Sequence, residues 1–331
     1  MTILAPHLCS FLLEHLPDQR GASKHTCKTY AYGFQILLCY ASKRFSTTPS
    51  ALDLEQIDTQ VVLDFLNHLE QKRGNSSSTR NGRLAAIKAF FKFIEFRVPS
   101  CIEQARQIQA IPAKKTVSTI PDYLNEQELQ SVLDAPDSTS YAGIRDRAML
   151  HLAFAAGLRV SELVSLLLAD LHLTPDPFII VMGKGRRERV LPLWKETTQC
   201  LRAWMAVRSC CEVPELFLNR HGVGMTRSGF EYILNKHCQS AASNQPSLSN
   251  KKVSPHILRR TCAMQTLHAT KDIRKVSLWL GHASQQTTEI YLRMDPSEKL
   301  DIMGSMVPPS VSRGEFRVTD KVLQMINPKY C

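Results

Sequence analysis

Four short stretches in the second half of the chain carry residues that are suited to binding and attacking a phosphate ester. In the first, AAGLRVSEL, Arg159 falls inside an apolar helical pattern. Glu162 follows three residues later on the same helical face, where its carboxylate can hold the guanidinium through a charge-assisted hydrogen bond. Taken alone, this stretch is more typical of a partly buried ion pair.

The second stretch is a glycine-rich turn. The segment FIIVMGKGRRERVLPL predicts two short strands joined by a tight turn, because β-branched and apolar residues flank Gly183 and Gly185. Lys184 lies at the tip of this hairpin, and Arg186 and Arg187 follow it. Taken alone, the tip is typical of a solvated loop or of a loop that contacts phosphates without reading sequence. A P-loop is excluded, because the pattern G-x-x-x-x-G-K-[ST] does not occur in this stretch.

The third stretch, SPHILRRTCA, predicts the start of a helix. Ser254 is a typical cap and Pro255 a typical first helical residue. His256 and Arg259 then share one face of the first turn. Oriented backbone amides and a planar guanidinium together form a natural phosphate site, although the spacing H-x-x-R is common.

The fourth stretch, WLGHASQQTTEIYLR, predicts a helix end, a turn and a second helix. Gly281 ends the first helix, His282 lies in the turn, and Ser284 caps the helix that carries Tyr291. A tyrosine on a short amphipathic helix usually belongs to a core. Two arginines, two histidines, a lysine and a tyrosine in one region of a basic chain instead favour phosphoryl chemistry.

The first hundred residues predict helices at 23–44, 58–73 and 79–97. Asp58 can cap the second of these helices and Gly74 can end it. In the third helix the apolar residues recur at steps of three and four, which predicts one buried face formed by Leu84, Ile87, Phe90, Phe91 and Ile94. Four basic residues lie largely outside this face: Arg80, Arg83, Lys88 and Lys92. A solvated helix face is the more usual explanation, but the charge of the whole chain favours phosphate contacts.

The segment that follows these helices predicts a boundary between two domains. The sequence AIPAKKTVSTIP carries two prolines and two adjacent lysines, which is typical of a linker. Beyond it, Asn125 and Glu128 form a capping-box pattern that opens a new helix running towards Leu133. A chain of 331 residues is also long enough for two ordinary domains.

The composition indicates a polyanionic partner. The formal net charge is +11 and the isoelectric point is about 9.2, which suits nucleic acid or an anionic membrane surface. No apolar run approaches the roughly 20 residues that span a bilayer, so we expect a soluble intracellular protein. The ten cysteines are scattered through apolar stretches, and Cys210, Cys211, His237 and Cys238 lack C-x-x-C spacing. We therefore expect free thiols and no zinc site.

The four stretches together resemble the catalytic domain of the tyrosine recombinases, also called phage integrases, from Asn125 to about Arg293. The resemblance implies that Tyr291 is the nucleophile. It implies further catalytic roles for Arg159, Lys184, His256, Arg259 and His282. Two features depart from the family pattern: Arg260 replaces a more usual histidine, and about forty residues follow Tyr291.

The resemblance also implies a fold: mostly α with a small β-sheet, arranged as a two-domain, C-shaped DNA clamp. Residues 1–110 would form a helical core-binding domain of the SAM-like type, and residues 111–121 a linker. Residues 122–300 would form the α+β catalytic domain. Residues 301–331 would form a tail, which either docks on a neighbouring protomer, as the resemblance favours, or packs on its own catalytic domain or stays disordered.

The implied activity is site-specific DNA recombination through a 3′-phosphotyrosyl intermediate and a Holliday junction, without ATP, metal or any other cofactor. The absence of a clustered acidic triad agrees, because two-metal nucleases use carboxylates to hold Mg²⁺. The implied partners are double-stranded DNA and a tetramer of this chain or of related recombinases, in the cytoplasm on the nucleoid and away from membranes. The long tail favours integration or transposition of a mobile element over chromosome-dimer resolution.

Two alternatives belong to other classes. A type IB topoisomerase shares the chemistry but reseals the same strand. A non-catalytic DNA-binding subunit would be free to lose Tyr291 or one of the arginines, and neither is lost.

Overall fold

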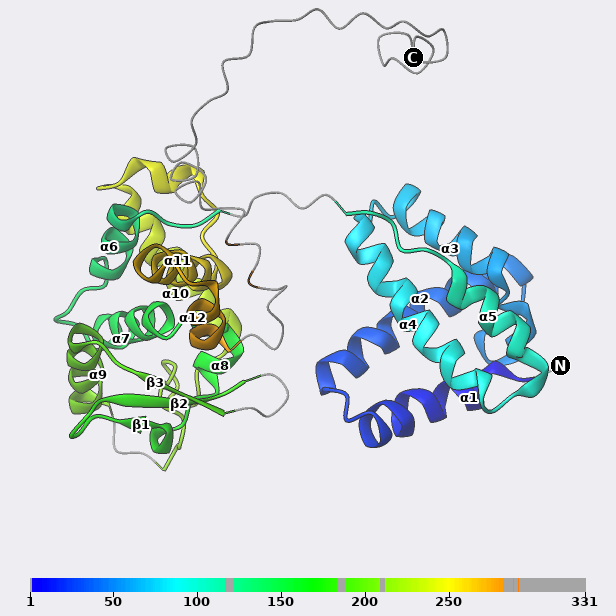
Figure 1. The fold of residues 1–331 in the computed structure, drawn as a ribbon, viewed down its shortest axis with the longest axis horizontal. Coiled ribbons are helices and arrows are strands. Elements are labelled where there is room, and N and C mark those ends of the chain that lie inside the picture. Colours follow the sequence, from blue (N-terminus) through cyan, green and yellow to red (C-terminus); the bar gives the residue numbers. More distant parts are fainter. Residues whose placement is uncertain are drawn as a thin grey trace, which may run out of the picture. The chain divides into compact units, whose positions relative to one another are not determined.

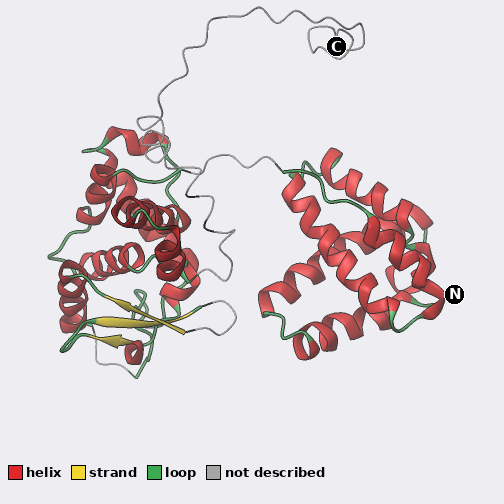
Figure 2. Ribbon diagram, viewed as in Figure 1, coloured by secondary structure: helices red, strands yellow, loops and turns green. Residues whose placement is uncertain are grey.

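The computed structural model describes residues 2–116, 122–183, 188–208, 212–281, 288 and 291 (Figure 1). The chain forms two compact units, Met1–Thr119 and Ile120–Cys331. The division falls inside the segment 111–121 that was expected to be a linker. Helices dominate both units, and the strands lie in the second (Figure 2).

Polar caps set the helix starts of the first unit. Asp58 accepts a hydrogen bond from the amide of Val61, and Ser76 accepts one from the amide of Thr79. Because Ser76 is the cap, the third predicted helix begins two residues earlier than expected. Gly74 has a φ of +61°, as expected for a residue in the turn that follows a helix. The helices are α1 (Leu4–Ser10), α2 (Lys24–Phe45), α3 (Thr59–Gln71), α4 (Ser77–Glu95) and α5 (Ile102–Ala110), with a π-helical stretch at Phe11–Gln19 and 3-10 turns at Pro49–Ala51, Leu54–Gln56 and Pro99–Cys101.

The apolar face predicted on α4 is buried. It forms the centre of the unit's own core, where Phe11 meets Phe34 and Phe90 edge to face. Helix α5 was not expected, because its few apolar residues lie between two prolines. Ala105 and Ile108 of α5 are buried in the same core, so this helix belongs to the first unit and ends just before the expected linker.

The second unit packs helices on a small antiparallel sheet (Figure 2). Its strands are β1 (Leu171–His172), β2 (Phe178–Met182) and β3 (Glu188–Pro192), in the order β1-β2-β3. The predicted hairpin is confirmed: β2 and β3 are antiparallel, with Val181 opposite Arg189. The two-residue strand β1 was too short to be recognised in the sequence.

The helices of this unit follow the predicted signals. The capping box of Asn125 and Glu128 is confirmed at the start of α6. Ser254 precedes α11 and Pro255 is its first residue, although the Ser254 side chain makes no capping hydrogen bond. The helices are α6 (Glu126–Asp134), α7 (Tyr141–Ala155), α8 (Val160–Val164), α9 (Lys195–Val207), α10 (Arg227–Ala242), α11 (Pro255–Thr270) and α12 (Ile273–Leu280), with 3-10 turns at Leu168–Asp170 and Pro246–Asn250.

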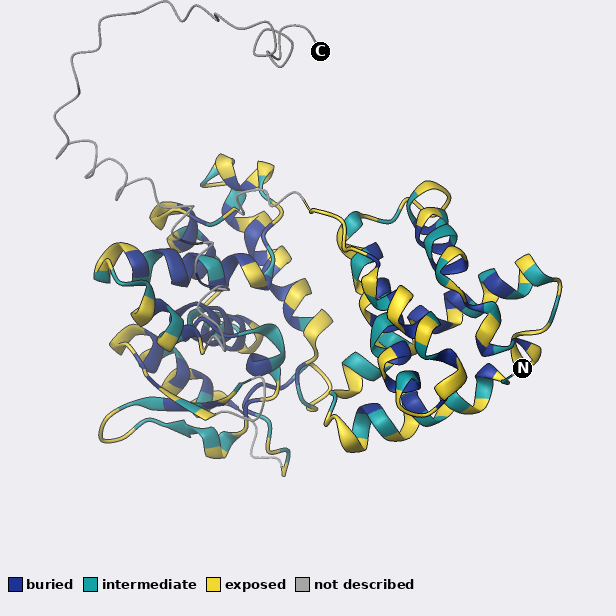
Figure 3. Ribbon diagram, turned by 45° about the vertical axis from the view of Figure 1, so that its right-hand side comes forward, coloured by how far each residue is buried: buried dark blue, intermediate teal, exposed yellow. Residues whose placement is uncertain are grey.

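Most residues of helices α7 and α11 are buried, although His256 at the start of α11 is exposed; in both units the buried residues face inwards (Figure 3). They form the second core, together with Trp204 of α9 and the inward residues of the sheet. Each unit therefore buries its own apolar residues. Among the described residues, no helix is long and apolar enough to cross a membrane.

Candidate active site

Arg159 lies at a break between two helices. We predicted it inside a helix, which is wrong: it is the N-cap of the five-residue helix α8. Gly157, with a φ of +55°, follows the end of α7, so the apolar pattern spans the end of one helix and the start of the next. The predicted pair with Glu162 is confirmed, since Nη1 of Arg159 donates to Oε1 of Glu162 at 2.6 Å. The Arg159 side chain keeps 28% of its surface exposed and is accessible to a ligand.

Arg259 is held by backbone carbonyls of two other segments. Its Nη1 donates to the carbonyl oxygen of Gly157 at 2.5 Å and its Nη2 to that of Leu280 at 2.8 Å. Burial, followed by repulsion from Arg159, lowers its pKa to about 10. The guanidinium therefore keeps its charge at neutral pH. It also joins the helix end before Arg159 to the end of α12.

Glu162 is a buried carboxylate shared by three arginines. Beside Arg159, it accepts from Nη2 of Arg189 at 2.8 Å, and Nη1 of Arg259 lies 3.8 Å from its Oε2. Burial alone would raise its pKa, but the hydrogen bonds and charges of Arg189 and Arg159 outweigh burial and leave the pKa lowered. Three guanidiniums share one ionised carboxylate, so the cluster keeps an excess of positive charge for an anion.

Arg189 was missed by the sequence analysis, which assigned DNA contacts to Arg186 and Arg187. Those two residues lie outside the described residues. The strand period contained the signal: Arg189 and Leu191 lie on the same face of β3, and Leu191 is buried. An arginine two residues from a core leucine on one strand must point inwards as well.

His256 and Tyr291 lie in the field of the same arginines. His256, in the first turn of α11, is partly solvent-exposed. Desolvation of the enclosed part of its ring lowers its pKa, as do Arg260, Arg259 and Arg159, against an opposing effect of Glu231. Tyr291 is 5% exposed, and burial raises its pKa although Arg259, Arg260 and Arg159 act to lower it. The structure thus brings together four of the six residues expected to be catalytic.

The other two expected catalytic residues, Lys184 and His282, lie outside the described residues. Their neighbours are described. Gly281 ends α12 with a φ of +63°, as predicted. A Cβ atom at Gly281 would lie 3.0 Å from Cδ of Arg189, so this turn and the arginine are in close contact.

Two of the basic residues expected to contact phosphates are engaged within the first unit. Arg80 is 5% exposed and its Nη1 donates to the carbonyl oxygen of Pro112 at 3.3 Å. Nζ of Lys88 donates to the carbonyl oxygen of Gln109 at 2.6 Å. We expected both side chains to contact DNA phosphates. Helix α5 and the segment after it pack on this side of α4. This corrects the expectation for Arg80, which is buried, whereas Lys88 is half-buried and its phosphate contact stays a prediction.

The other two remain accessible. Arg83 donates to the carbonyl oxygen of Thr29 at 3.0 Å and lies over the ring of Tyr32, but it is only half-buried. Lys92 is exposed.

Two of the four residues considered as zinc ligands, His237 and Cys238, lie within the described part of the chain. His237 is buried, and its Nε2 lies 2.9 Å from Oδ2 of Asp146. Burial raises the pKa of the Cys238 thiol to about 12. Cys210 and Cys211 lie outside the described residues, and among the described residues no group of three or more His, Cys, Asp or Glu is placed to hold a metal ion.

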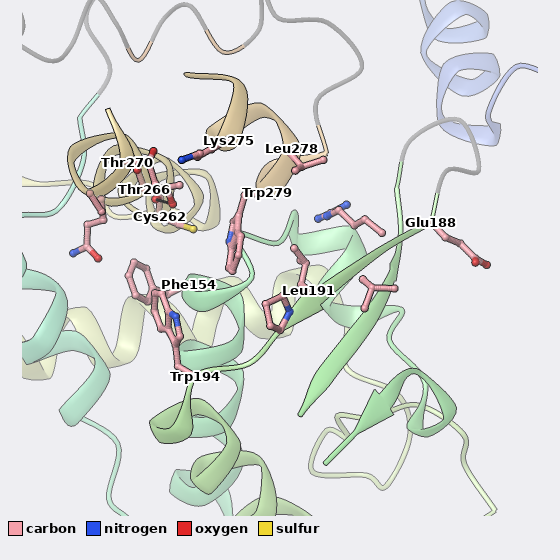
Figure 4. Close-up of a pocket in the computed structure, with 15 residues that line it drawn as sticks. Phe154, Glu188, Leu191, Trp194, Cys262, Thr266, Thr270, Lys275, Leu278 and Trp279 are labelled. Carbon is pink, nitrogen blue, oxygen red and sulfur yellow. Dashed lines mark hydrogen bonds between the residues drawn. The ribbon is translucent and has the colours of Figure 1, made fainter. Parts of the chain in front are cut away.

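An apolar groove of about 830 Å³ lies beside the arginine cluster, between β3, the start of α9, and helices α11 and α12. Figure 4 shows the rings of Phe154, Trp194 and Trp279 around it, with Leu191 of β3 on another side. Leu278 at its rim is 80% exposed. Its lining is too apolar for a phosphate and suits an apolar segment.

Comparisons with known proteins show the family to which the chain belongs. A model of the phage integrase family matches residues 122–298, and a model of the phage integrase N-terminal SAM-like domain matches residues 11–97. The chain belongs to the phage integrase family. It is a tyrosine site-specific recombinase. Site-specific recombination is therefore favoured over the two alternatives, a type IB topoisomerase and a non-catalytic DNA-binding subunit.

Relatives match this phage integrase over nearly its whole length. The putative integrase/recombinase y4rC of Sinorhizobium fredii (strain NBRC 101917 / NGR234) is 39% identical over 324 residues, which cover 98% of both chains. Tyrosine recombinase XerD of Listeria innocua is 30% identical, over 89% of this chain and 97% of its own. The fold is similar to that of XerH bound to palindromic difH substrate in a post-cleavage complex, with a TM-score of 0.66 and 24% identity over 86% of this chain and 81% of that one.

Proposed function

We propose that Tyr291 is the covalent nucleophile of this recombinase and that Arg159 and Arg259 clamp the phosphodiester it attacks. The observation that carries this proposal is the shared carboxylate of Glu162, which holds both guanidiniums where their charge also acts on Tyr291. A planar guanidinium matches the non-bridging oxygens of a phosphate and stabilises the charge that develops in the transition state.

Proton transfers complete the reaction. The phenol oxygen of Tyr291 attacks phosphorus while its proton passes to His256, and the bond between phosphorus and the 5′ oxygen breaks. Lys184 donates a proton to the departing 5′ oxygen, and His282 donates a hydrogen bond to a non-bridging oxygen. The product is a 3′-phosphotyrosine with a free 5′ hydroxyl. Because the phosphodiester energy is retained, the 5′ hydroxyl of another strand can attack this linkage and no ATP is required.

Double-stranded DNA is the substrate in this proposal. Positive side chains of both units, Arg83 and Lys92 on α4 and Arg186 and Arg187 after the hairpin tip, contact phosphates and position the duplex. The accessible surfaces of Arg83 and Lys92 and the net charge of +11 support this. The XerH structure contains its difH substrate, and a Tn1549 transposon integrase of similar fold (TM-score 0.64, 16% identity) is bound to transposon right end DNA. In this proposal the chain acts on the nucleoid in the cytoplasm, where it integrates or transposes a mobile element.

Tyr291→Phe tests the nucleophile. The change removes one oxygen, so DNA binding should persist while covalent capture on a nicked suicide substrate disappears. Tyr232→Phe is the matched control, because Tyr232 lies in the same unit and is 71% exposed. Its adduct should equal that of the unchanged protein. Protein–DNA adducts that persist in Tyr291→Phe would overturn the assignment.

Assembly is the finer part of the proposal: a tetramer on DNA, of this chain or of this chain with related recombinases, in which the tail of one protomer docks on the next. Val322, Leu323 and Ile326 would share one face of a helix in the tail. A stripe this short needs a docking surface. The apolar groove beside the arginine cluster, with its exposed rim residue Leu278, is a receptor of matching chemistry. A head-to-tail contact of this kind closes into a ring.

Deletion of residues 310–331 should leave single-site DNA binding nearly intact but impair synapsis and strand exchange. Leu278→Glu, which places a charge at the groove rim, should reproduce this defect in the full-length chain. Val223→Glu is the control, because Val223 is also exposed (54%) and does not line the groove. Recombination of paired sites by the truncated chain at the full-length rate would remove the tail from assembly.

A further inference from the structure

Arg189 is a largely buried member of the arginine cluster and contacts Glu162 with two of its nitrogens. We propose that it is a positioning residue for strand cleavage, which acts through Glu162 to keep Arg159 directed at the phosphate; the inference rests on the proposed function. Its side chain is only 11% exposed, against 28% for Arg159. Its positive charge therefore acts mainly on the buried carboxylate of Glu162.

The contact with Glu162 involves both ends of the carboxylate. Nη2 of Arg189 donates to Oε2 at 2.8 Å and Nη1 to Oε1 at 3.4 Å. Oε2 also accepts the backbone N–H of Arg159 at 3.0 Å, and Oε1 accepts Nη1 of the same residue at 2.6 Å. Glu162 is thus surrounded by donors that fix the orientation of its carboxylate plane.

The orientation of the Glu162 carboxylate determines how many N–H donors of Arg159 remain free to bind a ligand. A guanidinium has five N–H donors in a rigid fork, and a carboxylate can take two of them at once. With Arg189 in place, Glu162 engages one nitrogen of the Arg159 fork. Without Arg189, the buried carboxylate loses its bidentate partner and its most favourable replacement is the rest of the Arg159 fork. Arg159 would then turn from the phosphate towards Glu162.

A second contact places Arg189 beside the turn that ends α12. A Cβ atom at Gly281 would lie 3.0 Å from Cδ and 3.1 Å from Nη1 of Arg189. Arg259 binds the carbonyl oxygen of the preceding residue, Leu280, at 2.8 Å. Both arginines therefore brace this turn, and Arg189 ties β3 to it as well as to α8.

Arg145→Ala is a matched control for the loss of a buried ion pair. Arg145 lies in the same unit with a side chain 10% exposed, and it binds a buried carboxylate, Asp146, at 2.7 Å. Both alanine variants should lower the melting temperature. At a temperature where both are folded, Arg189→Ala should lower the single-turnover cleavage rate by about 10²-fold, the usual effect of a misplaced catalytic group. DNA binding should change little, and Arg145→Ala should cleave nearly as fast as the unchanged protein.

Two further measurements separate positioning from loss of stability. In an Arg159→Ala background, Arg189→Ala should add little to the cleavage defect, because both changes remove the same contact to the phosphate. On a methylphosphonate substrate, in which a neutral methyl replaces one non-bridging oxygen, the defects of Arg159→Ala and Arg189→Ala should shrink together. Arg189→Lys keeps the charge without the fork and should show a smaller defect with the same selectivity; it replaces Arg189→Ala if that variant does not fold.

Additive defects in the double variant, or an Arg189 defect that is equal on both substrates, would overturn the positioning role. Cleavage by Arg189→Ala and Arg189→Lys at the unchanged rate would overturn it as well. Failure of the unchanged protein to form any adduct would contradict the proposed function instead, so the two failures are distinguishable.

Discussion

Burial moves the pKa of His256 and that of Tyr291 in opposite directions, and both shifts favour the neutral forms. Burial lowers the pKa of the imidazole and raises that of the phenol. A neutral imidazole can accept a proton at neutral pH. A neutral phenol needs such an acceptor, because its ordinary pKa of about 10 leaves little phenolate. The environment therefore suits a transfer from Tyr291 to His256 that is coupled to attack.

The low pKa of His256 leads to a prediction for Arg260, the position where the family more usually has histidine. After desolvation, the positive charge of Arg260 is the next largest cause that lowers the pKa of His256. Arg260→Gln removes that charge, so the pKa rises and the imidazole becomes protonated at a higher pH. As pH falls, the cleavage rate should then begin to decline at a higher pH than in the unchanged protein.

A pH profile of single-turnover cleavage between about pH 5 and pH 8 checks this shift. Arg274→Gln serves as the control, because Arg274 is an exposed arginine of α12 and is not among the charges that act on His256. An acid limb that stays in place, or moves to lower pH, would exclude His256 as the proton acceptor.

At the scale of elements, the short break between α7 and α8 positions the clamp. Gly157 takes a left-handed conformation there, and its carbonyl oxygen holds Arg259. Two residues later, Arg159 caps α8. A side chain at Gly157 would meet Cδ2 of Leu280 at 2.5 Å and Sγ of Cys262 at 3.1 Å, so the space is already filled.

Gly157→Ala should lower the free energy of unfolding by about 2 kcal/mol or more, because it combines backbone strain with overpacking. It should also slow cleavage, because the carbonyl that anchors Arg259 must move. Gly222→Ala is the matched control: its φ is +76°, and a Cβ there would have no neighbour within 4 Å. Denaturant unfolding and single-turnover cleavage check both variants. Equal losses in the two would show that the close packing at Gly157 has no role.

Local signals made many elements predictable from the sequence. The capping box at Asn125 depends on four consecutive residues, and the hairpin depends on the β-branched and apolar residues that flank Gly183 and Gly185. Arg159 was placed wrongly because an apolar pattern continues across a helix break, which the glycine alone did not reveal. The strand period of β3 could have shown that Arg189 points inwards, but its partner Glu162 lies 27 residues away in the sequence, and only the fold brings the two together.

The same limit applies to the basic face of α4. Sequence spacing placed Arg80 and Lys88 outside the apolar stripe, and this is compatible with either solvent or another part of the chain. Helix α5 carries too few apolar residues to be predicted, and its packing decided the question by supplying backbone acceptors such as the carbonyl of Gln109. The periodicity of a single segment does not predict tertiary contacts of this kind.

At the scale of the whole molecule, the net charge of +11 predicts that DNA affinity falls steeply with salt. Each neutralised phosphate releases counterions, with a slope of about −0.9 per contact in a log-log plot. Arg83→Ala and Lys92→Ala should each reduce that slope by about 1 and weaken binding to all sequences alike. Fluorescence anisotropy on a specific and a scrambled duplex, at several salt concentrations, measures both effects. A flat plot would contradict binding by phosphate contacts.

The two separate cores have an evolutionary consequence. One core forms around Phe90 and Phe91 and the other around Met264 and Trp204, and each consists of residues from a single unit. A substitution that disturbs packing in one unit is therefore not passed through a shared core to the other. Each unit can therefore accept changes in its core while the packing of the other unit, including the arginine cluster of the second, stays unchanged. A chimaera that joins residues 1–116 of one relative to the second unit of another would therefore keep both cores intact.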